Sequence, residues 1–423
     1  MQYKKTTLSN GLRILTIPMK NTETVTVIIM VGVGSRYETE KEAGLSHFIE
    51  HMMFKGTEKR PTTLDISETL DSIGGEFNAF TGSDRTAYYA KVDAKHMDVA
   101  LDVISDIFLN SKMEEKEIEK EKGTIIQEIN MFEDTPMADV EIVLGNLLYK
   151  KNPLGRYPTG SKKTVSAFKK ADFIGYLNRF YVANDTVLCI AGNFNEKKTL
   201  DLAKKYFSGM KKGIKPKYKR VKEIQSKPEL ALKYKNTDQT HLLLGNRAFN
   251  WNHKDRFALG LLAVILGGNM SSRLFIEVRE KRGLAYHVRT SVDAFEDCGY
   301  IATQAGVNHD KLELTVKTIL DEYRKISTEK VSKKELQKAK DYIKGKSVMN
   351  FESSDDVAMF FVDQEVKKKK IMALDEIFKK IDKVSEGDIL RVAKEIFQNK
   401  KLNLAIIGPH KNEEKIKKLL NIC

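Results

Sequence analysis

A chain of 423 residues is too long for one ordinary hydrophobic core, which predicts two or more domains. Its hydrophobic fraction of 41% is that of a soluble globular protein, and its longest apolar stretches, such as 25–33, are far shorter than the roughly 20 residues that cross a bilayer. The net charge of +14 comes mostly from Lys mixed with Glu along expected helix faces, a pattern that disfavours nucleic-acid binding.

The chain opens on a strand-turn-strand pattern rather than on a targeting segment. Met1 leads almost directly into Leu8–Leu12, with no apolar stretch before it, so we expect no cleaved secretion signal. The cysteines, Cys189, Cys298 and Cys423, are scattered and have no C-x-x-C spacing, which indicates a reducing compartment and supplies no metal cluster. These features together predict a cytoplasmic protein.

Strand-like runs alternate with amphipathic helices through the first half, which predicts mixed layers of sheet and helix. The predicted strands cover residues 4–8, 13–17, 25–33, 76–81, 86–92 and 186–191. The predicted helices cover residues 42–54, 63–72, 97–110, 114–132, 137–148 and 165–180.

The segment 211–228 is rich in Lys and Pro and lacks apolar periodicity, so we interpret it as a linker. The order of elements then repeats, with strands predicted at 230–234, 241–245, 284–293 and 300–305 and helices at 254–266, 311–326 and 333–349. The sequence of 113–123 also resembles that of 331–341. We therefore predict a domain at residues 1–210 and a second, related domain at residues 229–423.

The most informative motif lies in the helix predicted at 42–54. His47, Glu50 and His51 form the pattern H-x-x-E-H. At 100° per residue the two histidines lie about 40° apart on a helix, so both imidazoles can reach one metal ion. Zinc lowers the pKa of its bound water toward ~7, and Glu50 is close enough to take the proton as that water attacks a peptide carbonyl. The alternative is an ordinary packed or solvated histidine pair. The second half has no H-x-x-E-H in the corresponding place.

A catalytic zinc needs a third protein ligand, and the helix predicted at 114–132 offers two candidates. Glu121 and Glu128 are seven residues apart and share one stripe of that helix. Glu128 lies among apolar residues, where a buried carboxylate needs a partner. Glu121 lies in a run of charged residues, so a solvated side chain is the stronger interpretation of it from the residues alone.

Further motifs follow the same order as in a known family. Leu8–Leu12 and 74–81 belong to this set, as do 153–160 and 267–274, together with His47 to His51 and, after 76 intervening residues, Glu128. In this order and spacing, the chain resembles the pitrilysin family of zinc metallopeptidases, the M16 inverzincins. It is similar to the short form of that family, which includes the mitochondrial processing peptidase β-subunit and its bacterial relatives.

The resemblance implies a fold, a metal and roles for the motif residues. The fold class would be α+β, with two homologous domains that are each a largely antiparallel sheet with packed helices. One zinc ion per chain would be bound by His47, His51 and Glu128. Glu50 would act as general base, and Glu121 would orient a ligand or the base. The activity would be that of a zinc metalloendopeptidase.

The resemblance also implies how substrate binds. Asn78, Ala79 and Phe80 would lie on or beside an exposed edge strand, where an extended peptide adds by main-chain hydrogen bonds. Such binding selects flexible peptides or unfolded segments, because a folded substrate has no free strand to offer.

In the second half, Arg279 and Tyr286 are similar to a family pair that contacts the substrate carbonyl near the zinc. A guanidinium and a phenol there would stabilise the developing oxyanion. Arg282 is the nearest competitor for the role of Arg279, and an ordinary surface Arg and core-edge Tyr are the alternative.

Family members of twice this length close two halves, each as long as this chain, around a chamber. The resemblance therefore implies that this chain pairs with a second chain. We expect a homodimer, or a heterodimer with a related subunit, with no nucleic acid and no membrane span. Arg279 and Tyr286 would then face the zinc of the partner. A non-catalytic partner or scaffold subunit is the main alternative function. Manganese or cobalt could replace zinc, since the same ligands accept several divalent ions.

Overall fold

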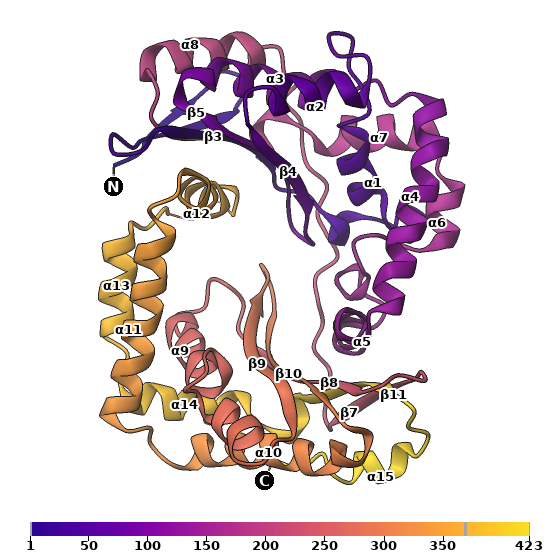
Figure 1. Ribbon diagram of the computed structural model, residues 1–423, viewed down its shortest axis with the longest axis vertical. Coiled ribbons are helices and arrows are strands. Elements are labelled where there is room, and N and C mark those ends of the chain that lie inside the picture. Colours follow the sequence, from indigo (N-terminus) through magenta and orange to yellow (C-terminus); the bar gives the residue numbers. More distant parts are fainter. Residues whose placement is uncertain (1, 368–369, 423) are drawn as a thin grey trace. The chain divides into compact units, whose positions relative to one another are not determined.

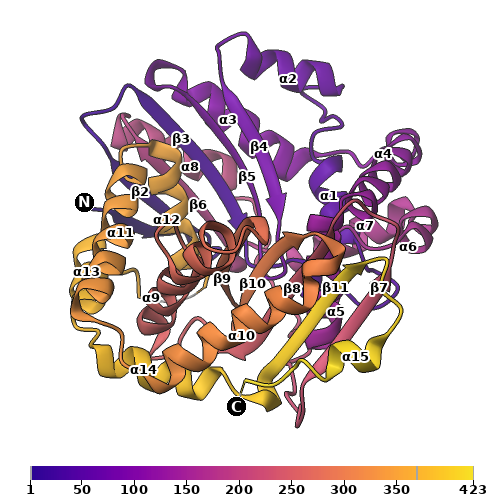
Figure 2. The same cartoon turned by 60° about the horizontal axis from the view of Figure 1, so that its bottom comes forward.

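The computed structural model describes residues 2–367 and 370–422, so Cys423 lies outside the described residues. The chain divides into two compact units, each built around one sheet (Figures 1 and 2). Unit 1 contains the residues up to Ile129 together with Arg156–Lys219 and Ser347–Leu374. Unit 2 contains Asn130–Gly155, Arg220–Lys346 and the residues from Asp375 onward.

The sheet of unit 1 has the strand order β1-β2-β6-β3-β5-β4, and its neighbours run antiparallel except for β2 and β6. Its central strands are continuous apolar runs because both of their faces are covered, whereas β4 at the edge is half exposed. The strands are β1 (Lys4–Thr7), β2 (Arg13–Pro18), β3 (Thr24–Val31), β4 (Glu76–Thr81), β5 (Thr86–Asp93) and β6 (Thr186–Gly192).

The sheet of unit 2 repeats this arrangement. Its order is β7-β11-β8-β10-β9, and here β7 and β11 are the parallel pair. Each strand matches one of unit 1 in position and direction, so β9 occupies the edge that β4 occupies in the first sheet. The strands are β7 (Glu229–Tyr234), β8 (Thr240–Ala248), β9 (Ala285–Ala294), β10 (Gly299–Val307) and β11 (Leu402–Gly408). The predicted α+β fold class is confirmed.

Helices cover both faces of the first sheet, and alternate residues of β3 point to the two sides. Val27 and Ile29 pack with α1, α3 and α7, whereas Ile28 and Met30 pack with α12. The helices of this unit are α1 (Leu45–Met52), α2 (Thr63–Asp71), α3 (Met97–Asn110), most of α4 (Glu115–Asp134), α6 (Lys162–Ala167), α7 (Lys170–Phe180), α8 (Glu196–Phe207) and α12 (Ser354–Val366), with the short turns η1 (Ser35–Tyr37), η2 (Ala94–His96) and η4 (Ala183–Asp185).

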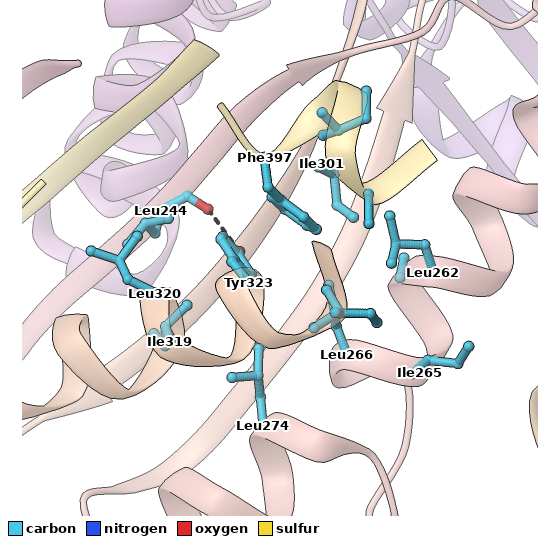
Figure 3. Packing of buried hydrophobic residues seen from close by; sticks show 14 of the residues in the cluster. Leu244, Leu262, Ile265, Leu266, Leu274, Ile301, Ile319, Leu320, Tyr323 and Phe397 are labelled. Carbon is cyan, nitrogen blue, oxygen red and sulfur yellow. Dashed lines mark hydrogen bonds between the residues drawn. The ribbon is translucent and has the colours of Figure 1, made fainter. Parts of the chain in front are cut away.

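Unit 2 has a large core between its sheet and the helices that follow β8 and β10. In Figure 3, Tyr323 of α10 stacks on Phe397 with ring centroids 4.1 Å apart, and its hydroxyl lies 3.5 Å from the Leu244 carbonyl oxygen. The helices here are α5 (Pro136–Tyr149), α9 (Arg256–Gly267), α10 (Leu312–Thr328), most of α11 (Lys333–Asn350), α13 (Leu374–Asp382), α14 (Glu386–Ile396) and α15 (Glu413–Lys417), with the short turns η3 (Pro153–Gly155), η5 (Phe275–Glu280), η6 (His309–Lys311) and η7 (Asn399–Lys401).

The two halves of the chain exchange one helix each. Helix α12 comes from the second half but packs on β3 and β6 of unit 1, where the Ser354 hydroxyl bonds the hydroxyls of Thr24 and Thr26 at 3.0 and 2.8 Å. Helix α5 comes from the first half but packs on β8 and β11, and its Asp139 pairs with Lys233 of β7 at 2.6 Å. Unlike the predicted domains, 1–210 and 229–423, the compact units are therefore not continuous in sequence.

Most predicted elements begin and end within two residues of the observed helices and strands. The strand predicted at 241–245 is longer, because β8 continues to Ala248, and two of the predicted helices differ for local reasons. The helix predicted at 42–54 begins only at Leu45, because Gly44 has a left-handed backbone with φ 99°. The helix predicted at 165–180 is two helices, α6 and α7, because Phe168 and Lys169 between them are extended. Helix α8, strand β11 and the helices from α12 onward were not assigned from sequence.

The segment 211–228 forms neither helix nor strand, but charged groups fix it on both units. Lys215 pairs with the buried Asp185 of unit 1 at 2.8 Å. The Val221 N–H donates to the carboxylate of Asp297 in unit 2 at 2.8 Å. No helix within residues 2–367 and 370–422 has both the length and the apolar composition needed to cross a membrane.

Phe361 tests whether the exchanged helix α12 belongs to the core of unit 1. Its side chain is 1% exposed and packs against the first sheet. We expect Phe361→Ala to lower the free energy of unfolding by about 3–5 kcal/mol, because a large buried side chain leaves a cavity. Chemical denaturation would measure this change. Met349→Ala, at a position that is 55% exposed, should stay within about 0.5 kcal/mol of the unmodified protein. Equal effects of the two changes would contradict the packing of α12.

Candidate metal centre

Helix α1 presents two imidazoles on one face. It is apolar on the side that faces the core, where Phe48, Ile49 and Met52 are buried, and this packing holds an otherwise short helix. His47 and His51 are one turn apart, and their ring centroids are separated by 4.6 Å. His47 is 8% exposed. The spacing of the motif therefore does bring both rings to one place.

Helix α4 brings a carboxylate to the same point. Glu128 Oε1 lies 3.4 Å from His47 Nε2, and Glu128 Oε2 lies 3.5 Å from His51 Nε2. Ligand atoms of His47, His51 and Glu128 all lie within 4.8 Å of one another. Ligands at about 2.05 Å from a tetrahedral zinc are themselves about 3.3 Å apart. The separations of Glu128 from the two imidazoles are close to this value and fit a zinc ion between the three side chains.

Glu121 fixes the orientation of one imidazole. It is 5% exposed, so the alternative of a solvated side chain is wrong. Its Oε1 accepts a hydrogen bond from His51 Nδ1 at 2.8 Å, and its Oε2 pairs with Lys55 Nζ at 2.6 Å. Because Nδ1 carries the proton toward Glu121, the Nε2 lone pair of His51 is left for a metal.

The charges of the site shift one another's pKa values. Burial disfavours a charged imidazole, but hydrogen bonds from His51 to Glu121 and Glu128 outweigh it and raise the pKa of His51 to about 9. Burial also opposes ionisation of Glu128, yet the two imidazoles lower the pKa of Glu128 to about 2. In the metal-free protein, the site therefore holds a carboxylate and an imidazolium at neutral pH.

Glu50 lies beside the ligands without belonging to the cluster of donor atoms. Its Oε2 is buried and has no hydrogen-bond partner in the described part of the chain. Burial raises the pKa of Glu50, while the nearby Thr81 hydroxyl and the two imidazoles act in the opposite direction. A carboxyl group with a raised pKa and a free oxygen suits a group that accepts and returns a proton.

The three residues predicted to bind substrate lie on β4. Asn78, Ala79 and Phe80 pair with Tyr89, Tyr88 and Ala87 of β5, and among the described residues no strand pairs with the other side of β4. Helix α1 packs against this strand, and Thr81 at its end lies near Glu50. The free edge of β4 is thus next to the candidate metal centre (Figures 1 and 2).

Arg279 and Tyr286 contact each other in unit 2. Arg279 lies in the π-helical turn η5, a rare conformation that is frequent at functional sites. Its Nη1 donates to the Tyr286 carbonyl oxygen at 3.0 Å, and its guanidinium lies 4.5 Å from the centre of the Tyr286 ring. The Tyr286 side chain is 80% exposed, whereas the competing Arg282 is paired with Glu277. Arg279 and Tyr286 are therefore in direct contact, and the phenol of Tyr286 is exposed.

Sequence reasoning missed two groups at this site. Lys55 pairs with Glu121, and the only sequence signal is its position four residues after His51. Thr81 approaches Glu50 only because β4 packs beside α1, and no local pattern could have indicated it.

Comparisons with known proteins agree with the geometry. Residues 13–160 match the family model for insulinase, peptidase family M16, and residues 167–343 match the model named peptidase M16 inactive domain. An "uncharacterized zinc protease" of Rickettsia felis is 38% identical over 409 residues, which cover 95% of this chain and 97% of that protein. A protein of the same description from Bacillus subtilis is 33% identical, with 97% and 99% covered. The crystal structure of a protease from Helicobacter pylori, 24% identical, superposes with a TM-score of 0.90 over 96% of this chain and 99% of that one.

Zinc binding should be linked to loss of a proton from His51. Metals bind the unprotonated imidazole, and the pKa of His51 is about 9 in the metal-free protein, so each zinc that binds should displace a proton. We expect the apparent zinc affinity to rise about tenfold per pH unit from about pH 7 and to level off above pH 9. Chelator competition at several pH values would measure the slope.

A matched pair of variants controls this experiment. Glu121→Gln removes a carboxylate that raises the pKa of His51, so the slope should flatten at a lower pH. Glu119→Gln makes the same change on the same helix at a side chain that is 68% exposed, and should leave the slope as it was. An affinity that does not change between pH 7 and pH 9 would contradict the proposed ligand.

Proposed function

Because the chain belongs to the M16 peptidase family, we propose that it is a zinc-dependent endopeptidase that cleaves extended peptides or unfolded segments. The observation that carries the proposal is the convergence of His47, His51 and Glu128 on one point, with the buried carboxylate of Glu50 beside it. One zinc ion per chain would be held by these three ligands. Its relatives are described as zinc proteases, which supports the choice of metal.

The chemistry divides between the metal and the side chains of the chain. Zinc would lower the pKa of a water molecule toward ~7 and polarise the peptide carbonyl. Glu50 would accept the proton of the attacking water and return it to the leaving amine, as its raised pKa favours. Glu121, held by Lys55, would keep His51 oriented throughout.

The edge strand supports a preference for flexible substrates. A peptide laid along the free side of β4 would bind through the main chain of Asn78, Ala79 and Phe80, which is independent of most of its sequence. A folded protein has no free strand to add there. Oligopeptides and unfolded segments would therefore be cleaved, and compact domains would not.

We also propose that a second chain completes the active site. Arg279 and Tyr286 would donate to the developing oxyanion, since the Tyr286 phenol is exposed and the Arg279 guanidinium supports its ring. The proposed assembly is a homodimer in which this pair serves the partner's metal centre, and a heterodimer with a related subunit would use the same surfaces. The proposed location is the cytoplasm.

Replacing Glu50 tests catalysis separately from metal binding. We expect Glu50→Gln to lower peptide cleavage by about 10²–10⁴-fold, because the amide cannot accept a proton, while one zinc per chain is still bound. Cleavage of a labelled peptide and metal analysis would measure the two effects. Glu58→Gln makes the same change at an exposed position shortly after α1, and should leave both the cleavage rate and the zinc content unchanged.

The same experiment distinguishes a non-catalytic scaffold subunit. A scaffold would show no cleavage that a chelator removes, and Glu50→Gln would change nothing. Zinc bound without any chelator-sensitive peptidase activity would therefore overturn the proposed function.

Mixing two inactive variants tests whether the site is shared between chains. His47→Ala removes a ligand, and Tyr286→Phe removes the phenol. If the pair acts on the partner's zinc, a mixed dimer has one complete site, so an equal mixture should recover about a quarter of the unmodified activity when exchange is statistical. Cleavage rates before and after mixing would show this. No recovery, with exchange verified by differently tagged chains, would contradict the shared site.

A further inference from the structure

Helix α1 carries its metal ligands close to an end that has no cap of its own. The helix has eight residues, and His47 is the third of them. Its N-cap is Gly44, which has no side chain to accept hydrogen bonds from the first turn. His47 lies within that first turn, with only Ser46 between it and the first helical residue, so the position of the turn largely sets the position of His47.

A carboxylate from outside the helix binds the free N–H groups. Glu38 Oε2 accepts from the Gly44 N–H at 2.9 Å, and Glu38 Oε1 accepts from the Ser46 N–H at 2.7 Å. Negative charge is also favourable at the positive end of the helix dipole. Both oxygens of Glu38 are thus used on the turn that leads into His47.

This placement opposes the ordinary preference of a carboxylate for water. Glu38 is 3% exposed, and burial raises its pKa to about 7, although the N–H groups of Ser46 and Gly44 act in the opposite direction. A carboxylate buried here without hydrogen-bond donors would be unfavourable. The N–H groups of Ser46 and Gly44, the Ser46 hydroxyl and the charge of Arg156 stabilise its charged form.

A second segment holds Glu38 in place. Arg156 donates to the carbonyl oxygens of Glu38 and Thr39 at 2.6 and 2.8 Å. Gly160 lies so close to the residues that lead into α1 that a Cβ there would be 2.2 Å from the Ala43 carbonyl oxygen. This gives a role to the 153–160 motif, which the metal centre itself does not use.

The segment before Glu38 reaches the substrate strand. The N–H groups of Ser35 and Arg36 donate to the carbonyl oxygens of Gly82 and Ser83, in the turn between β4 and β5, at 3.2 and 3.1 Å. The buried Arg36 pairs with Asp84 in the same turn at 3.0 Å. Residues 35–38 thus contact the edge-strand turn on one side and the metal-binding helix on the other.

We propose that Glu38 is a positioning residue that fixes the first turn of α1 and thereby places His47 relative to Glu128 and the edge of β4. The proposal rests on the proposed function only in taking His47, His51 and Glu128 as the zinc ligands. Glu38 does not touch the metal or the substrate, and it acts through the backbone of Gly44 and Ser46.

The decisive experiment compares Glu38→Gln with Glu42→Gln. In the first variant, an amide NH₂ replaces one of the oxygens that accept from α1. Glu42 lies on the same segment, but its carboxylate bonds the Thr39 N–H and Arg179, and only its backbone carbonyl bonds α1. Glu42→Gln leaves that backbone bond in place, so it is the matched control. We expect Glu38→Gln to lower zinc affinity about 10–100-fold in chelator competition, and to change the visible absorption spectrum of the cobalt-substituted protein. Glu42→Gln should change neither.

The outcomes separate three explanations. A lower melting temperature with unchanged zinc affinity and cobalt spectrum would overturn the proposal and leave Glu38 with a purely structural role. Unmodified protein that binds no zinc would overturn the proposed function instead. If Glu38→Gln does not fold, Arg156→Gln keeps Glu38 and removes only its support at a half-exposed position. It should shift zinc affinity and the cobalt spectrum in the same direction by a smaller amount, and no shift would overturn the proposal.

Discussion

The electrostatic balance between α1 and α4 is the interaction on which the candidate site depends. Glu50, Glu121 and Glu128 bring three carboxylates to one partly buried place, and Lys55 opposes them with one ammonium group. With neutral imidazoles, this leaves two negative charges, which a divalent cation neutralises. In the metal-free protein, a proton on His51 supplies part of the missing charge, which is why the pKa of that imidazole is so high. A bound metal ion and a proton on His51 are therefore alternative ways to compensate the same negative charge.

The two units share one sheet topology, but the corresponding connections between their strands carry different polar residues. In unit 1, the connection between β3 and β4 contains α1 with two of the proposed metal ligands, His47 and His51. In unit 2, the corresponding connection between β8 and β9 contains α9 and η5, and it ends at Arg279 and Tyr286. Helix α9 is almost entirely apolar and buried, so unit 2 has a packed helix in this connection but no residues that could bind a metal on that helix. The match of residues 167–343 to a domain named inactive agrees with this division.

How much the sequence predicted depended on whether a signal was local. The spacing of His47 and His51 determines their common helix face, and the short apolar runs of β3 and β6 indicate buried strands, so both were predictable. Glu128 and Glu121 could be proposed as a pair from helix spacing, but only the resemblance to a family separated their roles.

Other features depend on contacts between distant segments. Glu38 and Lys55 have partners that tertiary packing brings to them. Their surroundings in sequence give no signal for Glu38, and for Lys55 only its position four residues after His51. Helix α12 has a weakly amphipathic sequence, which gives little local signal of the face that it buries. The residues that it packs against, such as Ile28 and Met30, are more than 300 positions away in the chain.

The exchange of α5 and α12 also has a consequence for synthesis on the ribosome. One face of the first sheet is left uncovered until residues 354–366 leave the exit tunnel, so the N-terminal part of the chain must wait for the C-terminal part before its core closes. Between the emergence of β6 and that of α12, the nascent chain would therefore expose this apolar face of the sheet to water.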